Sequence, residues 1–414
     1  MCVKVDEILR KGVPELRMSM HYSRIIGITS LLLCHAAVAQ SANGGAAPTP
    51  SVPSAPIKIG WFGPLTGESA PWGIPELNTL KMMAEDCNEG GGFEVAGIKH
   101  TVEIIAYDDQ GQSSNAIRLA KKLASKDHVV AIVGPQGSGE AMPIGSTLAD
   151  AKVPCVATTA TNPLVTVAAD GKVKPYVFRA CFNDNYQGKV AAHFAYKTLE
   201  KHTAAILMEV DDPYSEILSR SFKENYEKLG GKVLIETSFR IGNKDFKSIL
   251  NKVKSADPEI VFMPIFYMDV VPLAKQAREL GLDKVFLGCD GWPNNDLIKS
   301  TSSSLNGCFY INHIDVNRLD SKPFLDKYMA KYHVAAELNS LLAHDAFAMV
   351  IDAIQRAAST KGEDIKAALE TTDIQGLSGR LKMGPSHDPV MKQAWIMKIS
   401  GSELTLQAAY ALEE

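Results

Sequence analysis

Short apolar runs alternate with longer amphipathic segments along most of this chain. Short apolar runs predict strands, and apolar positions spaced three or four residues apart predict helices. In the first part of the chain the predicted strands are 57–62, 101–107, 129–133 and 153–157, and the predicted helices are 75–88, 113–125 and 140–151. We therefore expect folded structure to begin at Ile57 as a unit of alternating strands and helices.

A second series of the same kind begins after Arg179. Its predicted strands are 204–208, 233–237, 260–264 and 285–287, and its predicted helices are 183–199, 214–229, 246–254 and 270–280. Strands that alternate with helices imply parallel sheets that helices cover on both faces. Two such series predict an α/β fold with two Rossmann-like lobes.

The remaining segments are too few to form a third lobe. They comprise a strand at 309–311, a helix at 343–358 and a strand at 394–399. We expect them to complete the two lobes, with crossings of the chain near 179–183, 310–313 and 384–387. The predicted N-terminal lobe then comprises residues 57–181 and 311–384, and the predicted C-terminal lobe comprises residues 182–310 and 385–414.

The first 39 residues have the pattern of an export signal. Arg24 precedes an apolar run at 25–33, and Ala37 and Ala39 supply the small residues of a cleavage site. The run is too short to span a bilayer. We therefore expect a periplasmic protein whose translation starts at Met1 or, in better agreement with such signals, at Met18 or Met20. A lipoprotein acylated at Cys34 is an alternative that the large residue before it disfavours.

A stretch rich in Ala, Pro, Ser and Gly follows the signal at 40–56 and predicts a disordered linker. Hydrophobic residues make up 46% of the whole chain, and the mean hydropathy of -0.04 is typical of a globular protein. The formal net charge is -4, and Lys and Arg form no basic run, which argues against nucleic acid as a partner. The seven cysteines include no CxxC pair, so we expect no zinc or iron–sulfur site and no cofactor.

Two neighbouring strands end in small, polar turns. The strand 129–133 ends in a turn rich in Gly that contains Ser138, and the strand 153–157 ends in the run Thr158–Thr161. Backbone N–H groups at a helix start attract anions, so the two turns together predict a cradle for a carboxylate. A phosphate loop would need a Lys after the glycines, and the glycine spacing does not fit a dinucleotide site. An ordinary strand-to-helix turn is the alternative.

Asp290 and three aromatic residues also follow predicted strands. An acidic residue at a strand end can receive a cationic group, although Asp290 is also suited to cap a helix or a turn. The three aromatic residues are Trp72, which is expected in a loop, and Tyr214 and Tyr267. Each is interpreted as the wall of a pocket or as a lid on a core.

The sequence offers no apparatus for catalysis. No G-x-S-x-G motif is present, and the histidines are scattered over helices and loops. Cys155 and Cys181 lie in apolar surroundings typical of buried thiols, and His344 and Asp345 are interpreted as structural. These features favour a protein that holds a small molecule over an enzyme.

Several motifs occur in order along the chain, and together they resemble a known family. They are 57–67, Tyr107-Asp108-Asp109, the Ser138 turn, 160–163, 176–179, 184–188, 276–278 and 288–291. The chain resembles the branched-chain amino acid class of periplasmic solute-binding proteins that serve ABC transporters. The resemblance implies the type I fold of two lobes, a monomer, and closure of the lobes on hinges around the ligand.

The resemblance also implies the ligand contacts. In the family the turn serine, here Ser138, binds the amino acid carboxylate, and the next strand end, here Thr159, Ala160 and Thr161, helps to hold the ammonium. The remaining implied contacts are the acidic ammonium ligand Asp290, the aromatics Trp72, Tyr214 and Tyr267, and Asp184 near the first crossing.

The chain departs from the family at specific positions. Gly111 and Gly137 stand where the family has a disulfide, and Asp290 is one methylene shorter than the Glu often found there. Leucine, valine, an aromatic amino acid or a related small acid or amide remain as ligands. The expected function is to bind a branched-chain or other apolar amino acid in the cleft between the lobes and to deliver it to an ABC permease in the inner membrane. A sensing module that signals through a protein partner is the alternative, and an exported enzyme is a third.

Overall fold

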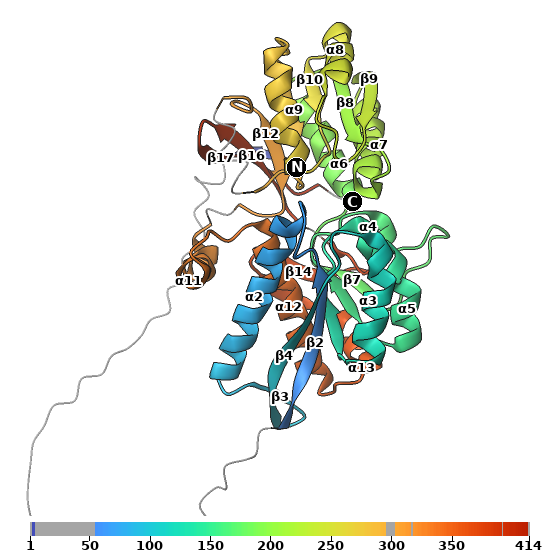
Figure 1. The fold of residues 1–414 in the computed structure, drawn as a ribbon, viewed down its shortest axis with the longest axis vertical. Helices are drawn as coiled ribbons and strands as arrows, with labels where there is room; N and C mark the ends of the chain where they lie inside the picture. The colour runs from blue at the N-terminus through green and yellow to red at the C-terminus, as the bar shows by residue number, and fades with distance from the viewer. Residues whose placement is uncertain (1, 5–53, 295–302, 316–317, 391, 413–414) are drawn as a thin grey trace, which may run out of the picture.

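The computed structural model describes residues 2–4, 54–294, 303–315, 318–390 and 392–412. Two lobes lie one above the other, and each is built on its own twisted sheet with helices packed against it (Figure 1). The predicted signal run at 25–39 and most of the predicted linker lie outside the described residues. Among the helices of the described ranges, none combines the length and the apolar character needed to cross a membrane.

The lower lobe in Figure 1 contains a six-stranded sheet in the order β3-β4-β2-β5-β6-β7, parallel throughout except for the antiparallel β3–β4 pair. Its strands are β2 (Ser54–Gly63), β3 (Phe93–Val95), β4 (Ile98–Asp108), β5 (Ala131–Val133), β6 (Cys155–Ala157) and β7 (Val177–Arg179). Its helices are α2 (Ala70–Glu89), α3 (Ser113–Ser125), α4 (Ser138–Ala141), α5 (Gly145–Ala151), α12 (Leu338–Ala357) and α13 (Gly362–Leu369).

The alternation of side chains along β2 determines which helices cover each face of this sheet. Ile59 and Trp61 point to the face that α2, α12 and α13 cover, and Phe62 points to the face that α3 and α5 cover. Because both faces are buried, β2 is apolar almost throughout rather than alternating between apolar and polar residues. A side chain at Gly60 would lie 3.0 Å from Leu123 of α3, so this position keeps the helix close to the sheet.

The upper lobe contains an eight-stranded sheet in the order β1-β17-β16-β12-β11-β10-β8-β9. The strands from β9 to β12 are parallel, and the antiparallel strands β16, β17 and β1 extend one edge. The strands are β1 (Cys2–Lys4), β8 (Thr203–Glu209), β9 (Lys232–Phe239), β10 (Ile260–Phe262), β11 (Val285–Gly288), β12 (Phe309–Asn312), β16 (Ala394–Ser400) and β17 (Glu403–Tyr410). The helices are α6 (Asp184–His193), α7 (Pro213–Lys228), α8 (Lys247–Ala256) and α9 (Tyr267–Glu279).

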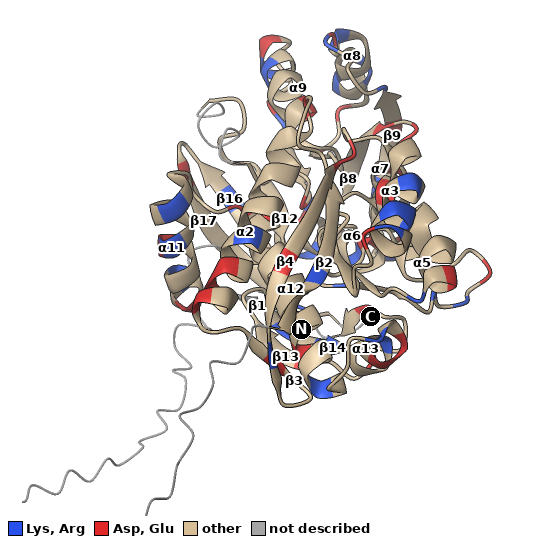
Figure 2. Ribbon diagram, turned by 60° about the horizontal axis from the view of Figure 1, so that its bottom comes forward, with Lys and Arg blue, Asp and Glu red and all other residues tan. Residues whose placement is uncertain are grey.

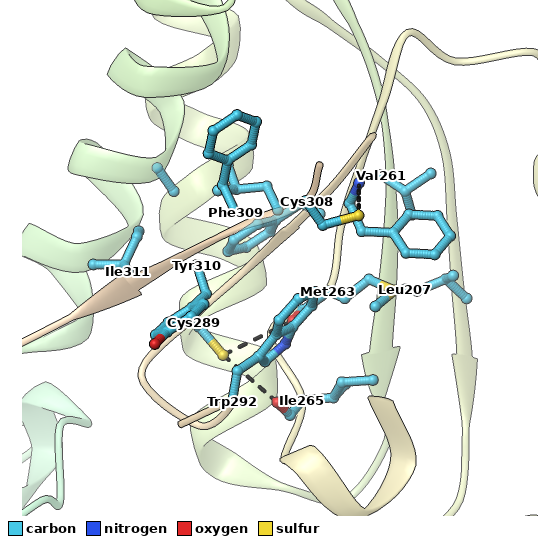
Figure 3. Packing of buried hydrophobic residues seen from close by; sticks show 14 of the residues in the cluster. Leu207, Val261, Met263, Ile265, Cys289, Trp292, Cys308, Phe309, Tyr310 and Ile311 are labelled. Carbon is cyan, nitrogen blue, oxygen red and sulfur yellow. Dashed lines mark hydrogen bonds between the residues drawn. The ribbon is translucent and has the colours of Figure 1, made fainter. Parts of the chain in front are cut away.

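Buried side chains fasten the loop that follows β11 to the core of the upper lobe (Figure 3). The Trp292 indole N–H donates to the Met263 carbonyl at 3.1 Å, and the Cys289 thiol donates to the carbonyls of Met263 and Ile265 at 3.8 and 3.6 Å. Trp292 also stacks near Tyr310 of β12. Residue 290 lies between these two anchored positions, so its place at the strand end is held from both sides.

A small antiparallel sheet and one further helix complete the structure. The sheet comprises β13 (Asp373–Gly376), β14 (Gly379–Met383) and β15 (Pro389–Val390), and Leu381 and Met383 pack into the core of the lower lobe. The helix α11 (Lys322–Tyr332) lies beside α2 in the chain that leads from β12 to α12. The apolar pattern of the sequence does not predict these strands, because they are short and half-exposed and lack a long apolar run.

The predicted start of the first helix at Pro75 was wrong. Helix α2 begins at Ala70, so Trp72 lies in its first turn and not in a loop, and Pro75 is inside the helix. Pro71 takes the position near the helix start where a missing N–H costs nothing. The predicted helix 183–199 is α6 followed by a π-helical turn at Phe194–Thr198.

A buried ion pair joins the segments that meet where the chain leaves the lower lobe. Arg179, at the end of β7, is fully buried and donates from Nε to Asp388 Oδ1 at 2.6 Å. The same guanidinium donates to the carbonyls of Ala160 and Asn162 at 2.8 and 2.9 Å. Asp388 also accepts from Thr166 at 2.7 Å, so both charges have several partners. Such a pair is costly to break, because one charge would stay buried without its counter-charge.

Glu76 of α2 is a second buried group that connects distant segments. The Trp61 indole N–H donates to its Oε2 at 3.2 Å, and the Thr158 hydroxyl donates to its Oε1 at 2.5 Å. Burial raises the pKa of Glu76 to about 8, with a smaller contribution from the negative charge of Asp109. The side chain therefore carries its proton at neutral pH in the folded protein.

The substitution Asp388→Ala is expected to lower the free energy of unfolding by about 3–5 kcal/mol, because it leaves Arg179 buried and unpaired. Urea denaturation measures this change. Asp373→Ala is the matched control, since Asp373 also pairs with an arginine, Arg380, but on the surface. It is expected to cost less than about 1 kcal/mol. Equal losses in the two variants would contradict the role of the buried pair.

The free energy of unfolding of the wild type is expected to fall as the pH rises from 4.5 to 8. The substitution Glu76→Gln is expected to abolish this fall. The folded-state pKa lies above the ordinary value of 4.5, so the contribution of the protonated form is full below pH 4.5 and is lost as the pH rises through 8. Between these values the wild type should lose on the order of a few kcal/mol relative to the variant.

Urea denaturation of both proteins at pH 5 and pH 8 (~3 pH units apart) tests this dependence. The exposed Glu103→Gln variant should show the same pH dependence as the wild type. A Glu76→Gln variant whose stability falls in parallel with that of the wild type would show that Glu76 ionises normally.

Candidate functional site

A cavity of about 490 Å³ lies between the two lobes and is lined by both. From the lower lobe it is lined by residues that follow β2, β4, β5 and β6, and from the upper lobe by residues that end or follow β8, β9, β10 and β11. The carboxyl ends of parallel strands are where α/β sheets bind ligands, because the loops there leave a crevice. Of the predicted site residues, the cavity lining includes Trp72, Ser138, Thr159, Tyr214 and Asp290.

The Ser138 turn lies at the cavity as the sequence predicted. Ser138 is the first residue of α4, and its hydroxyl oxygen accepts from the Asn162 N–H at 3.1 Å, which ties the turn to the neighbouring strand end. Thr159 donates to the Gln136 carbonyl at 3.1 Å and connects the same two segments. A side chain at Gly137 would meet the Glu140 carboxylate at 2.0 Å, so close packing accounts for this glycine.

Ala160 and Thr161 are fully buried and do not line the cavity. The Ala160 carbonyl accepts from Arg179, and the Thr161 carbonyl accepts from the Asp184 N–H at 2.9 Å. Arg179 and helix α6 therefore hold this segment in place, while Thr159 is the residue of the three that reaches the cavity. Direct ligand contacts from Ala160 and Thr161 stay a prediction.

Asp290 is the centre of a buried hydrogen-bond network in the upper lobe. Its Oδ1 accepts from the Tyr214 hydroxyl at 2.6 Å and from Gln187 Nε2 at 2.8 Å, and its Oδ2 lies 2.8 Å from His313 Nε2. The Gln187 side-chain oxygen accepts in turn from the Asp290 N–H at 2.9 Å. The network fixes both the loop and the carboxylate, so Asp290 reaches the cavity in one orientation.

Burial and the negative charge of Asp290 change the acidity of its neighbours. Burial, and secondarily that charge, raise the pKa of the Tyr214 hydroxyl, which therefore stays protonated and donates. Burial lowers the pKa of His313 despite its contact with the carboxylate. Asp184 is fully buried, does not line the cavity and has a raised pKa, because burial and then the Asp290 charge disfavour its ionised form.

Aromatic rings from both lobes meet at the cavity. The Trp72 ring lies 5.4 Å from Phe266 in an edge-to-face contact, and the Tyr214 ring stacks on Phe266 at 5.0 Å. Tyr267 packs against Trp72 at 5.9 Å but does not line the cavity, and Phe266 lines it instead. A direct ligand contact from Tyr267 therefore stays a prediction. The Trp72 indole N–H is buried and has no hydrogen-bond partner among the residues that the structure describes.

Sequence reasoning missed a group of carboxylates that lines the cavity. It comprises Asp109, Glu140, Glu209, Asp211, Asp212 and Asp269, here called the acidic lining. Arg240 is the one Lys or Arg among the described lining residues, although acidic and basic residues are interspersed over both lobes as a whole (Figure 2). These acids come from separate turns, so no local pattern in the sequence brings them together.

Burial raises the pKa of several carboxyl groups in the acidic lining. It raises the pKa of Glu209 to about 8, with added repulsion from Asp212 and Asp269. It raises the pKa values of Asp109, Asp212 and Asp269 to about 6. Burial is the first cause in each case, and repulsion by nearby carboxylates adds to it. A positive charge in the cavity would favour the ionised forms.

The described residues supply no evident metal site or reactive thiol. They contain no group of three or more His, Cys, Asp or Glu residues arranged to hold a metal ion. Cys155 and Cys181 are buried and unpaired, as the sequence predicted, and burial raises the pKa of the Cys181 thiol to about 12. Such thiols are poor nucleophiles at neutral pH.

Known proteins share this sequence pattern and fold. The Leu/Ile/Val-binding protein BraC3 of Rhizobium johnstonii is 28% identical over 337 residues, which cover 81% of this chain and 89% of the relative. The crystal structure of a leucine-binding protein, LivK, from Thermotoga maritima superposes with a TM-score of 0.77 at 27% identity and covers 85% of this chain and 98% of that one.

A second solved structure has the same likeness. The branched-chain amino acid transporter substrate-binding protein LivJ from Streptococcus pneumoniae, in complex with isoleucine, has a TM-score of 0.77 at 25% identity and covers 85% of this chain and 99% of that one. The profile of the periplasmic binding protein family matches residues 56–403. The predicted resemblance and the type I two-lobed fold are thereby confirmed, and this chain belongs to the periplasmic binding protein family.

Proposed function

We propose that this protein is an extracytoplasmic receptor that binds an amino acid between its lobes and delivers it to an ABC permease in the inner membrane. The observation that carries the proposal is the shared cavity, which the Ser138 turn lines from one lobe and Asp290 with Tyr214 from the other. An α-amino acid carries both an anionic and a cationic group. A site that buries it has to pair both.

The proposed binding mode follows from these two sides. The Ser138 hydroxyl and the N–H groups at the start of the helical segment receive the carboxylate. The ammonium donates to Asp290, whose oxygens have lone pairs left beyond those used by Tyr214, Gln187 and His313, and to Thr159. Trp72 and Phe266 form the apolar wall for the side chain. Roles for Ala160, Thr161, Asp184 and Tyr267 next to these contacts belong to the same proposal.

Binding between lobes implies a change in their arrangement. A ligand that contacts both lobes stabilises the closed form more than the open form, so it shifts the equilibrium toward closure. The closed form would then dock on the permease as a monomer. The relatives support an amino acid as the ligand, since BraC3 is named for Leu, Ile and Val, and LivJ was crystallised with isoleucine.

The same pocket would serve a module that senses a small carboxylate or amide and signals through a protein partner. No feature of the described residues favours that alternative. The family and its matched neighbours are binding proteins, so we also propose that the ligand leaves chemically unchanged.

At least one amino acid is expected to raise the unfolding temperature in a thermal-shift screen over amino acids, short amides and small carboxylates. A ligand at 100 times its Kd stabilises the folded state by about 2.7 kcal/mol, which gives a measurable shift. Shifts with amides or carboxylates alone would favour the sensing alternative or another solute. No shift with any amino acid would contradict the proposed ligand class.

Asp290→Ala is expected to weaken amino acid binding by several kcal/mol, measured by calorimetric titration, because the ammonium loses its buried counter-charge. Asp290→Asn keeps the side-chain volume and separates the loss of charge from any disturbance of the Tyr214–Gln187–His313 network. Asp170→Ala, at an exposed surface carboxylate, is the control and should bind as the wild type does. Wild-type affinity in Asp290→Ala and Asp290→Asn would refute the assignment.

A further inference from the structure

The acidic lining contains buried carboxylate oxygens that have no partner within the described part of the chain. Glu209, at the end of β8, is 5% exposed, and Asp269, in the first turn of α9, is equally buried. Neither carboxylate forms a hydrogen bond or ion pair with the residues that the structure describes. Asp109 is fully buried on the other lobe. Its Oδ1 accepts from the Gly111 N–H at 2.8 Å, and its Oδ2 has no hydrogen-bond partner among the described residues. The unpaired groups thus line the cavity from both sides.

Three other buried carboxylates among the described residues have partners on both oxygens. Asp388 pairs with Arg179, Glu76 accepts from Trp61 and Thr158, and Asp345 accepts from the N–H groups of Leu377 and Ser378 at 2.6 and 2.8 Å. Burying a charge without such partners is costly, and burial accordingly raises the pKa of Glu209 to about 8. A cation in the cavity would favour the ionised form of this carboxyl group. The contrast indicates that the partner of Glu209, Asp269 and Asp109 comes from outside the chain.

The protein's own cation does not fill this role. The Arg240 side chain is 83% exposed, and its nearest carboxylate is the exposed Asp211, at 4.0 Å. It is therefore directed to the solvent-facing edge of the acidic lining and leaves the buried carboxylates uncompensated. The positive charge of Lys244 lowers the pKa of Asp269, but Lys244 forms its ion pair with Glu68, at 4.0 Å.

We propose that the ligand is a dibasic amino acid, whose side-chain cation is held by Glu209 and Asp269 and by Asp109 across the cavity. The inference rests on the proposed function, in which Ser138 and Asp290 hold the carboxylate and the α-ammonium. The cation on the ligand side chain then contacts Glu209, Asp269 and Asp109, which have no part in holding the carboxylate and the α-ammonium. Trp72 and Phe266 favour an organic cation, because aromatic faces attract guanidinium and ammonium groups.

A metal ion is a poorer occupant of the acidic lining. The described residues contain no set of three or more acidic, His or Cys side chains that converges as metal ligands do. The cavity of about 490 Å³ lies within the range of small-molecule sites and exceeds what one ion needs. Carboxylates spread around such a volume match a cation on an extended side chain.

Pairs of ligands with the same shape and different charge test the inference. Calorimetric titration compares L-arginine with L-citrulline, and L-lysine with L-norleucine, with L-leucine as the reference. Arginine or lysine is expected to bind at least about tenfold more tightly than its neutral counterpart. If leucine or a neutral counterpart binds while arginine and lysine do not, the inference is wrong and the proposed function stands. If no amino acid binds, both are wrong.

Variants identify the carboxylates that hold the second charge. Glu209→Gln and Asp269→Asn, singly and combined, should each weaken the dibasic ligand by about tenfold or more and leave the neutral counterpart nearly unchanged. Glu227→Gln removes an exposed charge of α7 outside the cavity and is the control. Thermal melts verify folding, and the single variants keep the test valid if the double variant is unstable. Equal weakening of both ligands would show a structural role and contradict the inference.

Discussion

The guanidinium of Arg179 positions three separate segments of this protein. From the end of β7 it binds the strand-end carbonyls of Ala160 and Asn162 and the carboxylate of Asp388, which lies just before β15 in the small sheet. Thr159, which lines the cavity, is adjacent to the first of these carbonyls. The shape of the lower lobe at the cavity therefore depends on one buried charge and its partners. A hydrophobic side chain in place of Arg179 would supply no hydrogen bonds to hold these segments.

The upper lobe uses a network of hydrogen bonds for the same purpose. Gln187 of α6, Tyr214 of α7 and His313 after β12 all contact the Asp290 carboxylate. Because these partners come from two helices and a crossing segment, movement of any one of them changes the orientation of Asp290. The network thereby connects Asp290, the proposed ligand contact in this lobe, to the segment through which the chain leaves the lobe.

The carboxylates that line the cavity differ in the hydrogen-bond donors that the protein itself supplies to them. Asp290 has protein donors on both oxygens, whereas Glu209 and Asp269 have none among the described residues. The raised pKa of Glu209 reflects this difference, since burial and neighbouring carboxylates disfavour its ionised form. A cationic ligand near Glu209 would favour the ionised form of its carboxyl group.

The sequence by itself determined the alternation of strands and helices, the two α/β series, and the positions of Ser138, Thr159, Tyr214 and Asp290 at strand ends. These features are local: periodicity reports burial on one or both faces, and strand ends in parallel sheets share an edge. The start of α2 was misjudged because Pro71 and Pro75 both suit a helix start, and packing against the sheet decided between them. Only the tertiary structure brought Asp109, Glu209 and Asp269 to one cavity. They lie in distant segments, and their meeting depends on how two sheets face each other, which no local pattern encodes.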